Sequence, residues 1–145
     1  MASSDTPQSQ ASDGVGTTFT QTVTVQEADT VAAVLPGMPP VAATPYLVKI
    51  AEVACFRMVE GLLQPGQITV GSRVVIDHLG PSKVGAALVI EATLKEREKN
   101  RFRFSVRIQD GTRIVANVEH ERAAVSLQKI MAPSAHYKPP SKAGG

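Results

Sequence analysis

Cysteine and long apolar runs are nearly absent from this sequence of 145 residues. The single cysteine, Cys55, cannot form an internal disulfide or a cysteine metal cluster, which suits a reducing compartment. No apolar run approaches the roughly 20 residues that span a bilayer. The polar opening MASSDTPQSQASDG also lacks the basic and apolar blocks of a secretory signal. We therefore expect a soluble, cytoplasmic protein with no membrane partner.

Neither positive nor negative charge predominates in the sequence. Lysine and arginine number 15 and aspartate and glutamate 13, so the net charge is only +2. This charge is too small and too evenly spread to indicate a nucleic-acid partner. Hydrophobic residues make up 43% and charged residues 19%, as in globular domains, and the length suffices for one such domain. A multidomain enzyme is excluded.

The two ends of the chain differ in composition from its centre. Residues 1–16 are rich in Ser, Asp, Gln, Gly and Ala, and residues 131–145 combine Pro, Gly and Lys. Such segments bury too little apolar surface to offset the entropy lost on ordering. We predict a flexible N-terminal tail over 1–16, one folded domain over 17–130 and a flexible C-terminal tail over 131–145.

The first half of the predicted domain contains one strand, one loop and one long helix. The β-branched, alternating segment 17–24 predicts a strand, and LPGMPP at 35–40 predicts a loop that is a candidate lid. Thr44 as N-cap and a proline at the first helical position predict a helix over Pro45–Leu62. Glu52 lies at the border of the apolar face of this helix, in mostly dry surroundings.

The second half predicts long antiparallel strands over 68–78, 84–94, 101–108 and 113–127, with a hairpin at Asp110-Gly111. In 68–78 the even positions, from Ile68 and Val70 to His78, are expected to share the apolar face. One strand, one long helix and four antiparallel strands form an α+β pattern typical of a hotdog fold, in which the sheet wraps the helix. By analogy with that fold, we expect a homodimer.

Common catalytic motifs are missing from the sequence. There is no G-x-S-x-G elbow, glycine-rich phosphate loop, Rossmann fingerprint or paired-cysteine zinc pattern, so we expect neither metal nor cofactor. Thr44, Glu52 and His78 remain as candidates. Taken singly, they are explained as an N-cap, a boundary carboxylate and a half-buried histidine. Together, a hydroxyl, a carboxylate and an imidazole are the groups that acyl transfer requires.

Three segments, AATPYLVKIAEVACFRM, GSRVVIDH and HERAAVSLQKI, resemble the fluoroacetyl-CoA thioesterase family of hotdog acyl-CoA hydrolases. The resemblance extends from about residue 17 to about residue 133. In that family a Thr, a Glu eight residues later and a His twenty-six beyond it are catalytic, and Thr44, Glu52 and His78 reproduce both spacings. Gly71 and Arg122 fall where the family has a glycine near the acyl pocket and an arginine.

The resemblance implies hydrolysis of an acyl-CoA, with coenzyme A present only as part of the substrate. Glu52 would either attack the thioester carbonyl or activate a water, His78 would act as acid and base, and Thr44 would donate a hydrogen bond. Arg122, together with surface cations such as Lys83, could meet the phosphates of CoA. An acyl-carrier-protein thioesterase, an acyl transferase and a non-catalytic acyl-CoA-binding module remain as alternatives.

The candidate lid differs from that of the resembled family. Leu35 and Met38 stand where members specialised for fluoroacetyl groups have phenylalanines just before the catalytic Thr. We therefore expect a different acyl group, small or medium in size, and no strong selection for fluorine.

Overall fold

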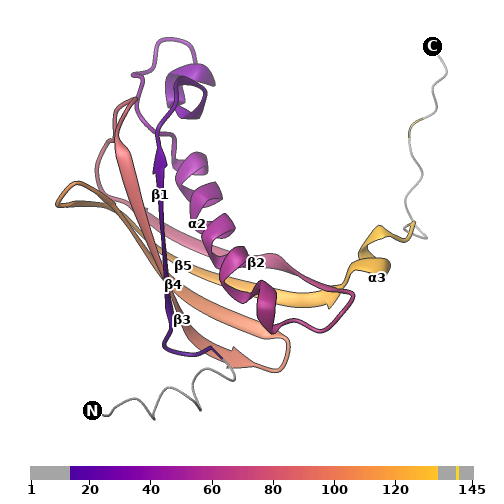
Figure 1. The fold of residues 1–145 in the computed structure, drawn as a ribbon. Coiled ribbons are helices and arrows are strands. Elements are labelled where there is room, and N and C mark those ends of the chain that lie inside the picture. The colour runs from indigo at the N-terminus through magenta and orange to yellow at the C-terminus, as the bar shows by residue number, and fades with distance from the viewer. Residues whose placement is uncertain (1–13, 134–139, 141–145) are drawn as a thin grey trace, which may run out of the picture.

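One curved antiparallel sheet and one long helix make up most of the fold (Figure 1). The computed structural model describes residues 14–133 and Pro140. The long helix, α2 (Thr44–Val59), lies across one face of the sheet. The strands are β1 (Thr18–Thr24), β2 (Gln67–His78), β3 (Ala87–Glu98), β4 (Arg101–Asp110) and β5 (Arg113–Ser126), in the order β1-β3-β4-β5-β2. The predicted α+β hotdog fold is confirmed.

The hydrophobic core lies between the sheet and α2. Leu47, Ala51 and Cys55 of the helix are buried against alternate residues of the strands. Those strand residues are Leu88, Ile90, Ala92 and Leu94 of β3, Phe102, Phe104, Val106 and Ile108 of β4, and Ala116, Val118 and Ala124 of β5. The alternation predicted for β3 and β4 is therefore confirmed.

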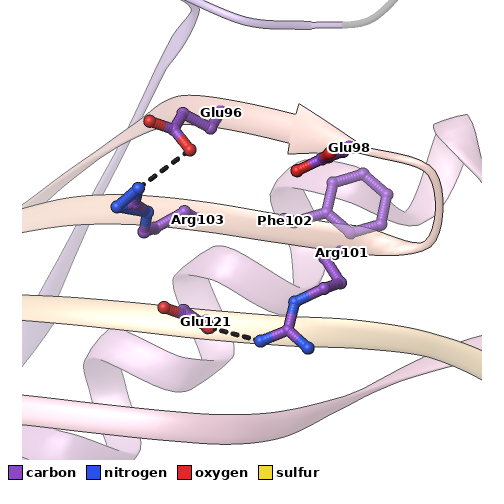
Figure 2. Close-up of a pocket in the computed structure, with 6 residues that line it drawn as sticks. All are labelled: Glu96, Glu98, Arg101, Phe102, Arg103 and Glu121. Atoms are coloured by element: carbon purple, nitrogen blue, oxygen red, sulfur yellow. Dashed lines mark hydrogen bonds and ion pairs between the residues drawn. The ribbon is translucent and has the colours of Figure 1, made fainter.

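The opposite face of the sheet is polar and carries cross-strand ion pairs. Figure 2 shows two of them, Arg103–Glu96 at 2.9 Å and Arg101–Glu121 at 2.8 Å, around a small pocket beside Phe102. Because the arginine side chains are largely exposed, each pair contributes at most about 1 kcal/mol to stability. This face is a solvated surface.

Among the described residues, strand β2 is an edge strand that pairs only with β5, and it is interrupted by a β-bulge at Ser72. The bulge reverses which side chains face the helix. Before it, Thr69 pairs with buried Ala124, whereas after it His78 pairs with buried Ala116. The prediction that Ile68 and Val70 share the face of His78 is therefore wrong, because one extra residue shifts the period of two.

The segment between β1 and α2 is folded back on itself. It contains the short helices η1 (Glu27–Asp29) and η2 (Val31–Ala33), followed by the predicted loop 35–40. An isolated bridge joins Val41 to Lys83, and the Ala42 N–H donates to the Ser82 carbonyl at 2.7 Å. Within the loop, Leu35 and Met38 are about half exposed. The candidate lid is thus tied to the connection between β2 and β3 just before α2 begins.

The ends of the described chain differ slightly from the predicted boundaries. Residues 1–13, 134–139 and 141–145 of the expected tails lie outside the described residues. Within the expected N-terminal tail, Val15 packs against the core and the Gly16 N–H donates to the Leu94 carbonyl at 2.8 Å. The helix α2 ends at Val59 and continues as η3 (Glu60–Leu62), and a short helix, α3 (Leu127–Met131), follows β5. None of the helices described is long and apolar enough to cross a membrane.

Candidate active site

Thr44 and His78 meet where α2 begins and β2 ends. The Thr44 hydroxyl lies 2.7 Å from Nδ1 of His78, within hydrogen-bonding distance. The prediction that Thr44 caps the helix is wrong. Ala43 occupies the N-cap position and Thr44 is the first helical residue, so its hydroxyl is free to bind the imidazole. The fold therefore brings together two of the three predicted catalytic residues.

Glu52, two turns further along α2, lies in a polar cluster formed with β2 and β5. Its Oε2 is 3.7 Å from Nη1 of Arg122 and 3.8 Å from Nε2 of His120. The side chain is 39% exposed. The expectation of mostly dry surroundings is therefore wrong, because helix neighbours alone do not reveal which polar groups the sheet places opposite.

Gly71 gives the Glu52 carboxylate room to approach the sheet. A Cβ atom at this position would collide with Oε2 of Glu52 and would lie 3.2 Å from Cε1 of His120. The glycine is thus required by close approach rather than by an unusual backbone conformation, since its φ is not positive. The family resemblance pointed to Gly71, and in the structure this glycine lies against the Glu52 carboxylate.

Arg122 is almost completely buried, with 7% of its surface exposed. Its Nε donates to the Thr69 hydroxyl at 2.9 Å and its Nη2 to the Thr69 carbonyl at 2.8 Å. Burial lowers the pKa of Arg122, while the nearby Glu52 carboxylate raises it. The guanidinium therefore faces Glu52 inside the domain, and the expectation that it meets CoA phosphates at the surface does not fit this position.

His120 is a member of the cluster that the sequence analysis missed. It is fully buried, its Nδ1 lies 2.8 Å from the Arg73 carbonyl, and its Nε2 lies 3.0 Å from Nη1 of Arg122. Burial lowers the pKa of His120; the hydrogen bond to Arg73 raises it and the charge of Arg122 lowers it further. The imidazole is therefore neutral at neutral pH. Its two-residue spacing from Arg122 on one strand was the available sequence signal.

The two groups of residues are separated along α2. Thr44 and Glu52 are eight residues apart, which is about 12 Å of helix. Within residues 14–133, no hydrogen bond or ion pair joins Glu52 to Thr44 or His78. The structure thus places the predicted set in two places within one chain, Thr44 with His78 and Glu52 with Gly71 and Arg122.

Neither catalysis by a cysteine thiolate nor a metal site is supported by the described part of the chain. Burial raises the pKa of the Cys55 thiol to about 12, so Cys55 is not a thiolate nucleophile at neutral pH. The described residues contain no group of three His, Cys, Asp or Glu side chains arranged to hold a metal ion. The carboxylate, imidazole and hydroxyl groups are left as the reactive side chains.

A curved antiparallel sheet wrapped around one long helix is the arrangement of the hotdog fold. Residues 25–128 match the family described as fluoroacetyl-CoA-specific thioesterase, and the chain belongs to this family. It is therefore a thioester hydrolase.

Individual relatives agree with this assignment. The fluoroacetyl-CoA thioesterase of Streptantibioticus cattleyicolor is 30% identical over 124 residues, which cover 81% of this chain and 89% of that protein. A crystal structure of a variant of the fluoroacetyl-CoA-specific thioesterase FlK has a TM-score of 0.76 and 30% identity, over 80% of this chain and 90% of that one. A hot-dog-like protein from Thermanaerovibrio acidaminovorans has the same TM-score at 22% identity, over 85% and 91% of the two chains, and supports the fold alone.

Proposed function

We propose that this enzyme hydrolyses small to medium acyl-CoA thioesters and uses Thr44, Glu52 and His78 as its catalytic set. The observation that carries the proposal is the 2.7 Å contact between Thr44 and His78 in a member of a thioesterase family. The reaction needs water and no cofactor, and coenzyme A enters only as part of the substrate. We place it in the cytoplasm, since a lone reduced Cys55 suits a reducing compartment.

In the proposed mechanism Glu52 either attacks the thioester carbonyl, forming a mixed anhydride that water then hydrolyses to the free acid, or takes a proton from a water that attacks the carbonyl directly. His78 then gives a proton to the departing CoA thiolate, and Thr44 orients the imidazole or the acyl group. The first N–H groups of α2 and the backbone of Gly71 stabilise the negative oxygen that develops on the carbonyl. Arg122 supports the site from beside Glu52, and Leu35 and Met38 close over the acyl group.

A homodimer accounts for the separation between Glu52 and the Thr44–His78 pair. We infer that two copies pair through β2, whose outer edge has no partner strand among the described residues. An antiparallel pairing of Val75 with the partner's Val75 sets Arg73 opposite the partner's Asp77, and the bulge at Ser72 then brings Gly71 opposite the partner's His78. Both of these residues lie on the helix-facing side of the strand. Each complete site then takes Glu52 from one chain and the Thr44–His78 pair from the other.

Mixed dimers test this shared site. Glu52→Gln and His78→Ala chains are each expected to be inactive alone, whereas co-expressed chains are expected to regain about a quarter of the parent activity. Half of the random dimers are mixed, and each mixed dimer contains one intact site of two. Light scattering at micromolar concentration measures the assembly. A fully active monomer, or mixed dimers without recovered activity, would contradict the shared site.

Selectivity among acyl groups is expected to be gradual. Leu35 and Met38 are flexible aliphatic side chains, so a lid built from them repacks around several acyl groups. An apolar pocket distinguishes one methylene by about 1–3 kcal/mol. We expect kcat/KM to change smoothly from acetyl- through propionyl- and butyryl-CoA to longer chains, without a large preference for fluoroacetyl-CoA.

Measurements of kcat/KM also distinguish acyl-CoA from the alternative substrates. Acyl groups presented on CoA are compared with the same groups on an acyl carrier protein, and products are followed as free CoA and free acid. A preference for fluoroacetyl- over acetyl-CoA above about 10³-fold would show that the aromatic lid is dispensable. Turnover restricted to the carrier protein, or binding of acyl-CoA without turnover, would favour one of the alternative functions.

A further inference from the structure

His120 connects the backbone of the edge strand β2 to the guanidinium beside Glu52. Its ring is inaccessible to solvent, and each nitrogen contacts a different group. We propose that His120 is a positioning residue, which acts on hydrolysis by holding Arg122 in the orientation that faces Glu52. The proposal rests on the proposed role of Glu52 and adds a residue to the same site.

The hydrogen-bonding partners determine the form of the imidazole. The Arg73 carbonyl can only accept a hydrogen bond, so Nδ1 of His120 carries the proton. Nη1 of Arg122 can only donate, so Nε2 of His120 presents its lone pair. The two contacts, at 2.8 Å and 3.0 Å, are thus satisfied together only by the neutral ring protonated at Nδ1.

The guanidinium is held at three points. Thr69 accepts from Nε and from Nη2, and His120 accepts from Nη1. Nη1 carries two hydrogens, so one of them remains for Glu52, whose Oε2 is 3.7 Å away. Without His120, the planar guanidinium would keep its two bonds to Thr69 and its contact with the Phe56 ring, but it could tilt about the edge bound to Thr69 and move Nη1 relative to Glu52.

The surroundings of His120 suit a neutral, fixed ring. Phe104 of β4 stacks on it with the ring centroids 6.1 Å apart, and Glu52 of α2 and Arg122 of β5 face Nε2. The charge of Glu121 also acts on it, from the next position along β5. Protonation of Nε2 would remove the acceptor that Arg122 uses, so the arrangement holds at neutral pH and is lost in acid.

Two substitutions separate positioning from a merely structural role. His120→Asn places an amide where Nδ1 lies, so it can keep the bond to the Arg73 carbonyl but cannot reach Arg122. His120→Gln reaches the position of Nε2 and offers an oxygen to Arg122, but loses the bond to Arg73. Each variant loses one hydrogen bond, so similar decreases in melting temperature are expected. Glu119→Gln, on the exposed face of the same strand, is the control.

The kinetic result is expected to differ between the two variants. His120→Asn should lower kcat for acyl-CoA hydrolysis by about tenfold or more, with KM nearly unchanged, whereas His120→Gln should recover most of the loss. In an Arg122→Lys background, His120→Asn should cause little further loss of kcat, because it acts through the guanidinium.

Equal kcat in the two variants and the parent protein would overturn the positioning role. So would kcat values that follow melting temperature alone in both variants. If Glu52→Gln is inactive while His120→Asn is fully active, the positioning role fails and the proposed function stands. If Glu52→Gln is fully active, the proposed function itself fails.

Discussion

Glu52→Gln is expected to lower acyl-CoA turnover by roughly 10²-fold or more, the usual consequence of removing a nucleophile or an acid–base group. Glutamine keeps the size of the side chain but removes the negative charge and the basic oxygen. It can neither attack the thioester nor take a proton from water. The measurement is kcat/KM of the purified variant with an acyl-CoA substrate.

Glu60→Gln is the matched control for this experiment. Glu60 follows the same helix, is exposed and makes none of the hydrogen bonds or ion pairs described for Glu52. The control should retain parent activity, and both variants should retain the helix and sheet content of the parent by circular dichroism. If Glu52→Gln turned over acyl-CoA as fast as the parent while folded, the carboxylate would have no catalytic role.

The regular parts of the fold could be predicted because one face of each element is buried. Alternation in β3 and β4 and the proline at the start of α2 directly encode local geometry. The bulge at Ser72 was not predicted, since a single extra residue leaves the apolar composition of the strand unchanged. The pairing of β2 with β5 depends on long-range contacts that no local pattern encodes.

In the candidate site, too, the residue types could be predicted from the sequence, but the contacts between residues distant in the sequence could not. The resemblance and the spacing selected Thr44, Glu52 and His78 as candidates, but spacing along the chain does not show that Glu52 lies apart from the other two. His120 was missed because it lies within a strand, and the local sequence does not show what its imidazole contacts. Its role depends on the Arg73 carbonyl, which the pairing of β2 with β5 brings to Nδ1, and on the side chain of Arg122, two residues further along the same strand.

Gly71→Ala is expected to impair catalysis far more than folding. The added methyl group would collide with Oε2 of Glu52 and displace the carboxylate from the position next to Arg122. The colliding atom is the end of a flexible side chain, and Cε1 of His120, at 3.2 Å, has to move by only a few tenths of an ångström. Gly71 does not have a positive φ either, so the strand backbone accepts alanine. A displacement of about 1 Å at a reacting group can cost about 10²-fold in rate.

Gly61→Ala is the comparison that isolates this effect. A Cβ at Gly61 would meet nothing within 4 Å, and its φ is not positive either, so this variant tests the general cost of exchanging glycine for alanine. We expect Gly61→Ala to retain the parent kcat/KM and Gly71→Ala to lose most of it, while both melt cooperatively. A fully active Gly71→Ala protein would mean that hydrolysis does not require the Glu52 carboxylate where it lies against β2, because the methyl group and the carboxylate oxygen cannot occupy the same space.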